Sequence, residues 1–343
     1  MAPSSSSSQT DKDIPPPVTD ANGSKIELRP YYGEKDLNYV HYLVYSTAFD
    51  QVPAGVRYIL SSPIVLGSWL ALFAILFVLV PKQLASFGWP NELMLAVRIA
   101  VVVFSLGGGL LFFYWYVDHY VVADKVHSAL SNDLKDPGAY YRTDQGNFWL
   151  LTVQNQPVAC IGIDMHKVTV MEQGPEKPNL AGSQAIQEAQ WPKTAAFLAT
   201  VDDKLRSFVS KSTKKKDEQK KVLFKAHKDN EASIRRLAVK TNLQDHGLST
   251  PLLKRVAFWA HSHQIEYLYA ETNQLQTKLA DILSKRHGYE LVSTTKTGWT
   301  GYKKVWRLDV RYWMTKEIDA REQQKEKEQE EKEMNELKDY FKK

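Results

Sequence analysis

Two long apolar runs constrain this chain more than any other feature of its sequence. The first, residues 58–80, reads YILSSPIVLGSWLALFAILFVLV and carries no charge. The second, residues 93–117, reads LMLAVRIAVVVFSLGGGLLFFYWYV and carries one charge, at Arg98. About 20 such residues cross the hydrocarbon core of a bilayer as a helix. Both runs are apolar on every face of a helix, so we predict two transmembrane helices in preference to two buried helices of a soluble core.

The flanks of the two runs predict how the pair is oriented. The intervening residues 81–92 are too few to form a domain, so we expect a helical hairpin with both long flanks on one side of the membrane. This linker holds one basic residue, Lys82, whereas Arg57, Lys125 and Lys135 lie just outside the hairpin. Because basic residues favour the cytosolic side, we predict that both termini are cytosolic and that the linker is luminal.

The second run carries three features that suit a membrane helix. Its last aromatic residues, 112–116, are typical of a membrane interface. Arg98 lies near the other end, where its side chain can extend to the opposite interface. Three consecutive glycines are expected to let the two helices approach closely, namely Gly107, Gly108 and Gly109.

The composition outside the hairpin excludes several classes of protein. Residues 1–24 are rich in serine and proline, so we expect a disordered tail, and they lack the apolar core of a signal peptide. Cys160 is the single cysteine and cannot form an internal disulfide. The formal net charge of +5 is too small to predict a nucleic-acid partner.

Two charged segments flank the remaining strand and helix patterns. Residues 173–229 interrupt those patterns for longer than an ordinary loop and contain the run KSTKKKDEQKK. We interpret this basic insert as a solvated loop, and contact with anionic lipid head groups is the alternative. Residues 315–343 mix both charge signs with few apolar positions, which predicts a solvated helix or a disordered tail rather than a coiled coil.

The first half of the remaining chain gives four element predictions. Apolar alternation and helical spacing are the signals used. They predict a strand at 26–29, a turn at Gly33 with an amphipathic helix from about Lys35, a helix at 120–134, and a strand pair within 146–170 that turns at Asn155 and Gln156.

A strand, a glycine loop and a helix start follow one another closely in residues 231–264. We predict a strand at 231–239 and a helix from Thr250, with KTNLQDHGLS between them. Backbone N–H groups of such a loop, together with the helix dipole, favour an anion. Gly247 lets a phosphate approach the backbone, and Pro251 suits a first helical turn. The dinucleotide and P-loop glycine patterns are absent from this loop.

This loop resembles that of the GCN5-related N-acetyltransferase (GNAT) family. The family's loop between its fourth strand and third helix typically reads Gln/Arg-x-x-Gly-x-Gly/Ala and cradles the pyrophosphate of acetyl-CoA. Gln244, Gly247 and Ser249 occupy these positions, with serine replacing the last small residue. The patterns at 265–272 and 287–292 are similar to the family's next strands.

The resemblance implies a fold, a co-substrate and a set of contacts. The fold is α+β, a mixed central sheet flanked by helices, here with an inserted two-helix transmembrane hairpin. The co-substrate is acetyl-CoA, with no metal, and the partner is an amine of a small molecule or protein. The implied cofactor contacts are Leu237, Val239, Gln244, Asp245, His246, Gly247, Leu248 and Ser249.

A narrower resemblance is to the camello-like, membrane-bound branch of this family. The stretches SALSNDLKDPGAYY at 128–141 and GNFWLL at 146–151 are similar to that branch in order and character. The resemblance implies an integral protein of the endoplasmic reticulum membrane that acetylates cysteine conjugates or lysines.

One departure from the family bears on catalysis. Many members have a tyrosine four residues before a Gly-Phe pair, placed to protonate the departing thiolate, but this chain has Ser284 at that spacing from Gly288. An alkyl hydroxyl is a much weaker acid than a phenol. The resemblance predicts an N-acetyltransferase. Because Ser284 replaces the tyrosine, the alternative is a catalytically inactive GNAT-fold interaction or scaffold protein.

Candidate acid and base residues lie near the predicted cleft. We expect a carboxylate, a histidine or water to deprotonate the attacking amine. Glu271 is the preferred base, Glu231 is a further carboxylate near a strand end, and Tyr289 is a nearby hydroxyl. His261 and His263 stand two apart, do not share a helix face, and predict no metal site.

These interpretations divide the chain into six parts. A single acetyltransferase domain is interrupted twice, once by the hairpin and once by the basic insert. The expected boundaries are a tail at 1–24, the first part of the domain at 25–57, the hairpin at 58–117, the rest of the domain at 118–172 and 230–314, the insert at 173–229, and the charged C-terminal segment at 315–343.

The predicted topology can be tested with engineered glycosylation acceptors. An acceptor placed within residues 81–92 is expected to be glycosylated in microsomes, because that linker faces the lumen. One placed in the C-terminal tail is expected to stay unmodified, as read by mobility on a gel with and without glycosidase. Modification of the tail alone would overturn the orientation.

Overall fold

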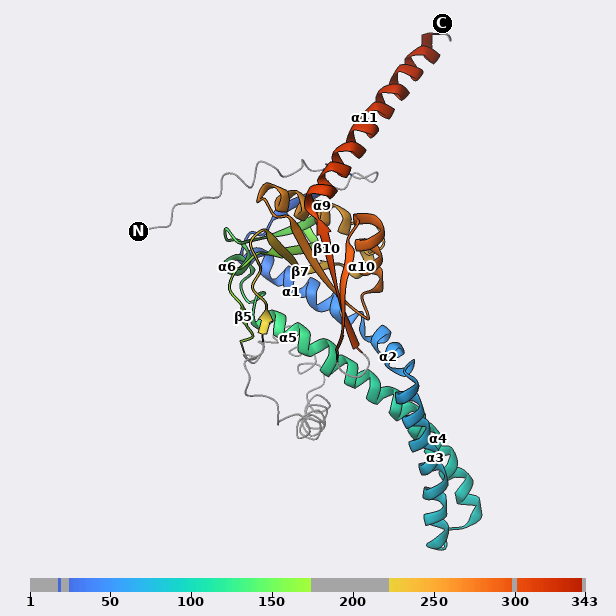
Figure 1. Ribbon diagram of the computed structural model, residues 1–343. Coiled ribbons are helices and arrows are strands. Elements are labelled where there is room, and N and C mark those ends of the chain that lie inside the picture. Colours follow the sequence, from blue (N-terminus) through green and yellow to red (C-terminus); the bar gives the residue numbers. More distant parts are fainter. Residues whose placement is uncertain (1–17, 20–24, 174–221, 298–300, 341–343) are drawn as a thin grey trace.

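The computed structural model describes residues 18–19, 25–173, 222–297 and 301–340, and within them a mixed central sheet (Figure 1). β7 and β8 are parallel, and every other neighbouring pair is antiparallel. The eight strands, in sheet order, are β1 (Val18–Thr19), β2 (Lys25–Pro30), β3 (Gly146–Val153), β4 (Gln156–Asp164), β7 (Glu231–Val239), β8 (Tyr267–Asn273), β10 (Gly301–Asp309) and β9 (Glu290–Thr297).

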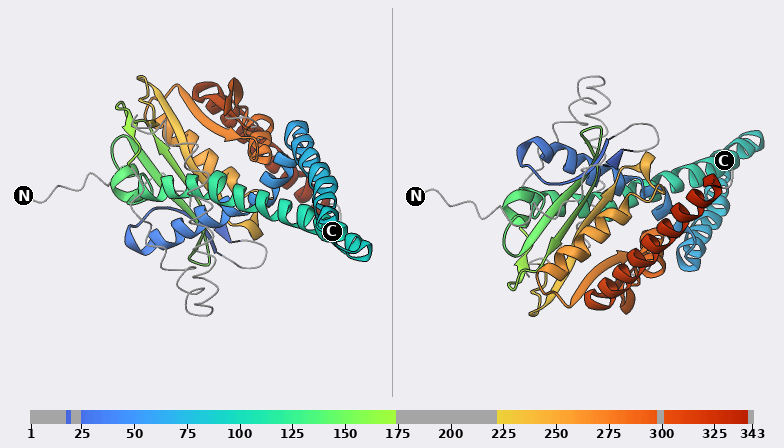
Figure 2. Two further views of the ribbon diagram at one scale, coloured as in Figure 1. Left: turned by 90° about the horizontal axis from the view of Figure 1, so that it is seen from below. Right: turned by 90° about the horizontal axis from the view of Figure 1, so that it is seen from above.

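Helices cover both faces of this sheet (Figures 1 and 2). Successive residues of β3 alternate between two buried clusters, so that Trp149 joins the core beneath α9 and Phe148 joins the core beneath α1. This explains why the central strands read as continuous apolar runs. The covering helices are α9 (Ser249–Ser262) on one face, and α1 (Glu34–Phe49) with α5 (Asp124–Ser131) on the other.

The apolar runs form an antiparallel pair of helices that projects away from the sheet (Figure 1). They are α3 (Pro63–Ser86) and α4 (Asn91–Tyr116), preceded by α2 (Val52–Leu60). By length and hydropathy both can cross a membrane, and none of their most apolar stretch is buried within the protein. The predicted fold class is therefore confirmed as an α+β mixed sheet, flanked by helices, with a two-helix apolar hairpin.

The hairpin differs in two details from the sequence prediction. α3 continues through Pro81 to Ser86, so the connection is shorter than the predicted linker. Membrane helices tolerate proline where neighbouring groups satisfy the freed backbone carbonyl. Of the three glycines, only Gly109 permits a close contact, since a Cβ there would lie 2.5 Å from the Trp69 ring, whereas Gly107 and Gly108 face open space.

The second hairpin helix runs on into the domain without a break. α4 passes through a π-helical stretch, η1 (Val117–Ala123), directly into α5. This rod spans 39 residues from Leu93 to Ser131, about 60 Å at 1.5 Å per residue. Val117 and Val122 pack with Val52 of α2 in a buried cluster, so the hairpin is fixed to the domain at its base.

Several predicted boundaries move by one to three residues. The β3–β4 turn falls at Gln154 and Asn155, both with positive φ, one residue earlier than predicted. Of the predicted basic insert at 173–229, only Gln173 and residues 222–229 are described, and β6 lies in the latter; the lysine-rich run at 211–221 lies outside the described residues. The remaining elements are α6 (Pro137–Tyr141), β5 (Val170–Met171), β6 (Val222–Phe224), η2 (Thr241–Leu243), α10 (Thr277–Asp281), η3 (Ile282–Arg286) and α11 (Val310–Tyr340).

The C-terminal segment forms one long helix, α11. It projects from the end of the domain that lies farthest from the hairpin (Figure 1). Its first turns pack against α9, where Phe258 meets Trp313 edge to face and Lys254 pairs with Glu317 at 2.6 Å. Beyond these contacts its exposed face is rich in charges of both signs.

His287 makes the stability of the fold depend on pH. Its side chain is 5% exposed, and burial, aided by the charge of Lys254, lowers its pKa to about 4. The unfolded chain takes up this proton near pH 6.5, so the folded state loses stability as pH falls from about 6.5 to about 4. In detergent, His287→Gln is expected to reduce the fall in Tm between pH 7 and pH 5, followed by tryptophan fluorescence.

The exposed His261 supplies the matched control for this measurement. His261→Gln is expected to retain the pH dependence of the parent. Identical pH dependence in the parent and in His287→Gln would contradict the assignment.

Candidate functional site

The sheet opens between its two parallel strands. β7 and β8 pair from Glu231 with Tyr267 as far as Ile234 with Ala270, and both strands then continue without pairing to each other. Their outer neighbours, β4 and β10, remain paired along this length. The inner backbone edges of β7 and β8 are thus left facing a gap, and their polar groups are available to a bound molecule.

A β-bulge lies where β7 leaves β8. Arg235 is the extra residue of β7 opposite Gly162 and Ile163 of β4. Its Nε donates to Asp164 at 3.0 Å, and Asp164 also accepts from the backbone and the ring of His166. Burial opposes ionisation, but these hydrogen bonds and the charge of Arg235 lower the pKa of Asp164 to about 2. An ionised buried carboxylate therefore fixes the bulge and the direction of the second half of β7.

The glycine loop lies at the end of this opening. Gln244 Nε2 donates to the Val239 carbonyl at 3.2 Å, which folds the loop back against its own strand. Gly247 adopts φ +77°, and a Cβ there would meet no atom within 4 Å. α9 begins at Ser249, and no side chain caps its N-terminus. The Thr250 N–H donates to the Gly247 carbonyl at 3.0 Å, whereas the positive end of the helix dipole is left open to a ligand.

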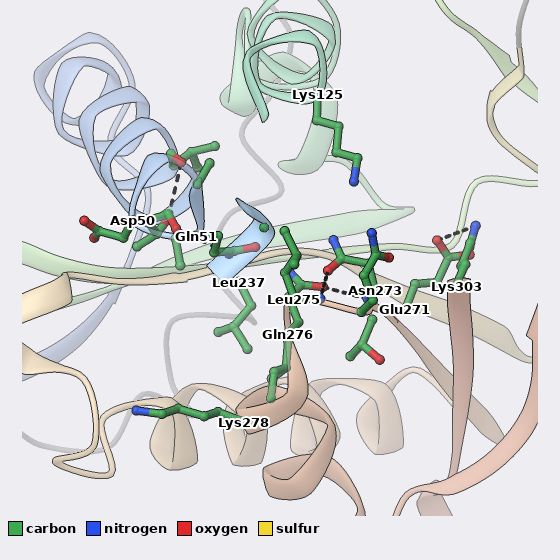
Figure 3. Close-up of a pocket in the computed structure, with 18 of the residues that line it drawn as sticks. Asp50, Gln51, Lys125, Leu237, Glu271, Asn273, Leu275, Gln276, Lys278 and Lys303 are labelled. Carbon is green, nitrogen blue, oxygen red and sulfur yellow. Dashed lines mark hydrogen bonds and ion pairs between the residues drawn. The ribbon is translucent and has the colours of Figure 1, made fainter. Parts of the chain in front are cut away.

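A single cavity of about 1740 Å³ joins the opening to the loop (Figure 3). Of the eight cofactor contacts implied by the family resemblance, seven line it: Leu237, Val239, Gln244, Asp245, Gly247, Leu248 and Ser249. The eighth, His246, is exposed, lies outside the lining, and places Nδ1 2.8 Å from the Gln244 carbonyl.

Glu271 is the candidate base that the structure places in the cavity. It lies on β8 just beyond the last residue paired with β7, and its Oε2 is 2.6 Å from Lys303 Nζ (Figure 3). Glu231 lies at the other end of the parallel pair, accepts from the Tyr269 hydroxyl at 3.2 Å, and does not line the cavity.

Tyr289 belongs to the hydrophobic core and not to the cavity. Its side chain is 4% exposed, and burial raises its pKa well above 10. No described group forms a hydrogen bond with its hydroxyl. Tyr289 therefore contributes to the packing of the core, and we assign it no catalytic role.

Ser284 is also turned away from the cavity. Its hydroxyl donates to the Ala280 carbonyl at 3.0 Å, one helical turn earlier. Its neighbours Leu283 and Lys285 line the cavity, but Ser284 does not. The site therefore holds no hydroxyl acid at the position where family members often have tyrosine.

Basic residues that the sequence reading missed collect around the loop. Lys278 on α10 pairs with Asp245 at 2.7 Å, which ties the loop to the next helix and lowers the pKa of the Asp245 carboxyl. The sequence could have predicted this proximity, because the segments that follow two neighbouring parallel strands lie at the same edge of a sheet. Lys125 of α5 enters from the opposite wall (Figure 3). Further basic side chains in the lining are Arg235, Arg236, Lys285, Arg286 and Lys303.

The two histidines at the end of α9 do not point to a ligand site: His261 is exposed, and His263, the residue after the helix, packs on Trp259. The ring of His263 stacks on Trp259 at 4.0 Å between centroids and sets Nδ1 2.9 Å from the Trp259 carbonyl. In the part of the chain that the structure describes, no group of three His, Cys, Asp or Glu side chains is arranged to hold a metal ion.

Solved structures with a similar fold include acetyltransferases of the GNAT family. A putative GNAT acetyltransferase from Desulfovibrio desulfuricans is 13% identical, with a TM-score of 0.31, over 56% of this chain and 82% of the other. An IAA acetyltransferase from Bacillus cereus is 10% identical, with a TM-score of 0.31, over 54% and 91% of the two chains. A putative streptothricin acetyltransferase from Bacillus anthracis, solved with acetyl coenzyme A, is 11% identical, with a TM-score of 0.30, over 50% and 66%.

No protein-family model and no curated protein sequence matches this chain. These identities and TM-scores are too low to assign an activity to this chain from its structural neighbours. The strand order, the opening between β7 and β8 and the uncapped loop are properties of this chain itself.

Proposed function

We propose that this protein is a membrane-anchored N-acetyltransferase that transfers acetyl directly from acetyl-CoA to an amine. One observation carries the proposal. The gap between β7 and β8 leads to the glycine loop that precedes the N-terminus of α9, which no side chain caps, and the gap and the loop line one cavity. A gap edged by free backbone groups suits the amide-containing arm of coenzyme A. A loop of N–H groups at a helix N-terminus suits its pyrophosphate.

The charges around the loop support an anionic ligand at this end. Lys278 pairs with Asp245 of the loop at 2.7 Å, and Lys285 and Arg286 line the same cavity. In the proposed complex the N–H groups of Gly247, Leu248 and Ser249 hold the pyrophosphate, and the backbone of Leu237 and Val239 contacts the arm. The acetyl group then lies in the opening, close to the bulge at Arg235.

The proposed reaction is a single displacement at the thioester carbon. The neutral amine forms a C–N bond to the acetyl carbonyl while backbone N–H groups of β7 stabilise the negative charge on oxygen. The C–S bond breaks, the amine proton passes to Glu271, and the CoA thiolate takes a proton from water. Lys303 Nζ lies 2.6 Å from Glu271 Oε2 and so fixes the position of this carboxylate in the opening.

We propose that the hairpin anchors this domain in the endoplasmic reticulum membrane, with both termini and the cavity on the cytosolic side, as in the camello-like branch. The two unburied apolar helices support the anchor. The charge bias across the hairpin supports the orientation.

A non-catalytic membrane interaction protein is the second candidate. The burial of Tyr289 and the backbone bonding of Ser284 favour it, because neither hydroxyl reaches the cavity. Such a protein keeps the loop and binds acetyl-CoA but turns nothing over. Calorimetric binding of acetyl-CoA with no CoA release in the presence of any amine would select this candidate.

The phosphate loop is tested by Gly247→Glu. The glutamate blocks approach to the backbone and adds a negative charge beside the pyrophosphate, so at least two charge-assisted hydrogen bonds are lost. Because each contributes about 1.5–3 kcal/mol, the acetyl-CoA affinity is expected to fall at least about a hundredfold by calorimetry.

Gly33→Glu is the matched control for this variant. Gly33 also precedes a helix, also has a positive φ, +80°, and also has no atom within 4 Å of its added Cβ, but it lies outside the cavity. Gly33→Glu is expected to bind acetyl-CoA as tightly as the parent. If Gly247→Glu folds and binds as tightly as Gly33→Glu, residues 244–249 are not the cradle.

The base is tested by Glu271→Gln. Loss of a positioned general base is expected to lower kcat/KM about a hundredfold and leave the acetyl-CoA Kd unchanged. Glu290→Gln is the control, since Glu290 is an exposed carboxylate on β9 outside the cavity lining. An equal, small effect of both substitutions on the release of CoA thiol would exclude Glu271 as the base.

A further inference from the structure

The cavity extends beyond the opening between β7 and β8 to the base of the hairpin. Its wall continues along α2, η1 and α5, the segments that lead into α3 and out of α4 (Figure 1). The residues that line this outer part are predominantly apolar or aromatic and are Tyr58, Ile59, Val65, Phe112, Phe113, Tyr116 and Val121.

These residues lie at the level expected for the membrane interface. Val65 is in the first turn of α3, and Phe112 and Tyr116 are in the last turns of α4. The aromatic cluster at this end of α4 is typical of an interfacial belt. One end of the cavity thus opens at the bilayer surface, and the other ends at the glycine loop.

The packing of α2 makes this wall continuous. A Cβ on Gly55 would lie 2.7 Å from Val117 Cγ1 and 3.5 Å from Leu275 Cδ1. α2 is therefore held directly between the continuous helix and the turn after β8. The same contact that fixes the hairpin to the domain joins the hairpin base to the gap beside Glu271.

Size and polarity indicate two occupants with different chemistry. A cavity of about 1740 Å³ exceeds the roughly 300–1,000 Å³ of an ordinary ligand pocket, so it has room for a second molecule beside the cofactor. Glu271, Lys303 and Lys125 stand at the inner part (Figure 3). Apolar groups line the outer part. A molecule that fits this gradient has a polar head inside and a hydrocarbon tail towards the membrane.

We propose, on the basis of the acetyltransferase function above, that the acceptor is a primary amine carrying a hydrocarbon chain and entering from the bilayer surface. Its tail lies against Val65, Phe112 and Tyr116, and its amine reaches Glu271. The amine nitrogen bonds to the acetyl carbon, the thioester C–S bond breaks, the amine proton goes to Glu271, and CoA leaves as its thiol after protonation by water. The product is an N-acetylated long-chain amine.

The chain-length dependence of acetylation tests this substrate class. The full chain in detergent, with saturating acetyl-CoA, is assayed with butyl-, hexyl-, octyl- and decylamine, using free concentrations corrected for partition into micelles. Because each buried methylene contributes about 0.8 kcal/mol, kcat/KM is expected to rise by about three- to fourfold per added methylene until the apolar part is filled. Amines of equal length interrupted by ether oxygens should gain far less.

Two neighbouring residues of α4 provide a matched pair of variants. Phe112 lines the cavity, whereas Leu111 is 72% exposed and does not. Phe112→Ala is expected to lower kcat/KM for decylamine about tenfold, with butylamine kinetics and the acetyl-CoA Kd unchanged. Leu111→Ala should leave all three quantities as in the parent.

The outcomes separate this inference from the function on which it rests. Failure of the parent to bind acetyl-CoA would overturn the acetyltransferase function itself. Three other outcomes, each with acetyl-CoA still bound, would overturn the long-chain acceptor alone. They are no turnover of any alkylamine, turnover that does not depend on chain length, and preference for a soluble polyamine or a lysine peptide.

Discussion

The rest of the site depends on one change in hydrogen bonding, the end of pairing between β7 and β8 after Ile234 and Ala270. Each strand remains bonded to its outer neighbour, so the sheet keeps its continuity while its centre opens. The bulge at Arg235, fixed by the buried carboxylate of Asp164, directs the second half of β7 away from β8. Without this divergence the glycine loop would follow an ordinary closed sheet and have no cavity beside it.

The hairpin is connected to that opening by a rigid element. α4, η1 and α5 form one helix, and its domain half packs against α1 and α2 while lining the cavity. The packing of Val117 on Gly55 leaves no room for a larger side chain on α2. Any tilt of the hairpin must therefore move a wall of the cavity, so that in the proposed membrane-anchored protein the position of the hairpin in the bilayer would affect the shape of the site.

Local sequence patterns predicted most helices and strands, whereas the continuity of helices and the burial of site residues depend on tertiary contacts. The strand predicted at 231–239 matches β7 in full. The continuity of α4 with α5 was missed, since the sequence predicted an apolar helix ending at residue 117 and a separate helix at 120–134. The glycine loop could be found from spacing, and seven of its eight predicted contacts line the cavity. Tyr289 could not be assigned this way, because only packing shows that its hydroxyl is buried in the core.

The two ends of the cavity face different surroundings because of where the hairpin is inserted. The chain leaves the domain after α2 and returns through η1. If the hairpin is membrane-inserted as proposed, the bilayer adjoins the wall formed by these helices. The glycine loop and α10 belong to the opposite wall, and α11 extends from the far end of the domain (Figure 1). A charged, water-soluble cofactor can thus enter beside α10 without crossing apolar surface. The proposed membrane-held acceptor would reach Glu271 from the hairpin side, so neither ligand would need to displace the other.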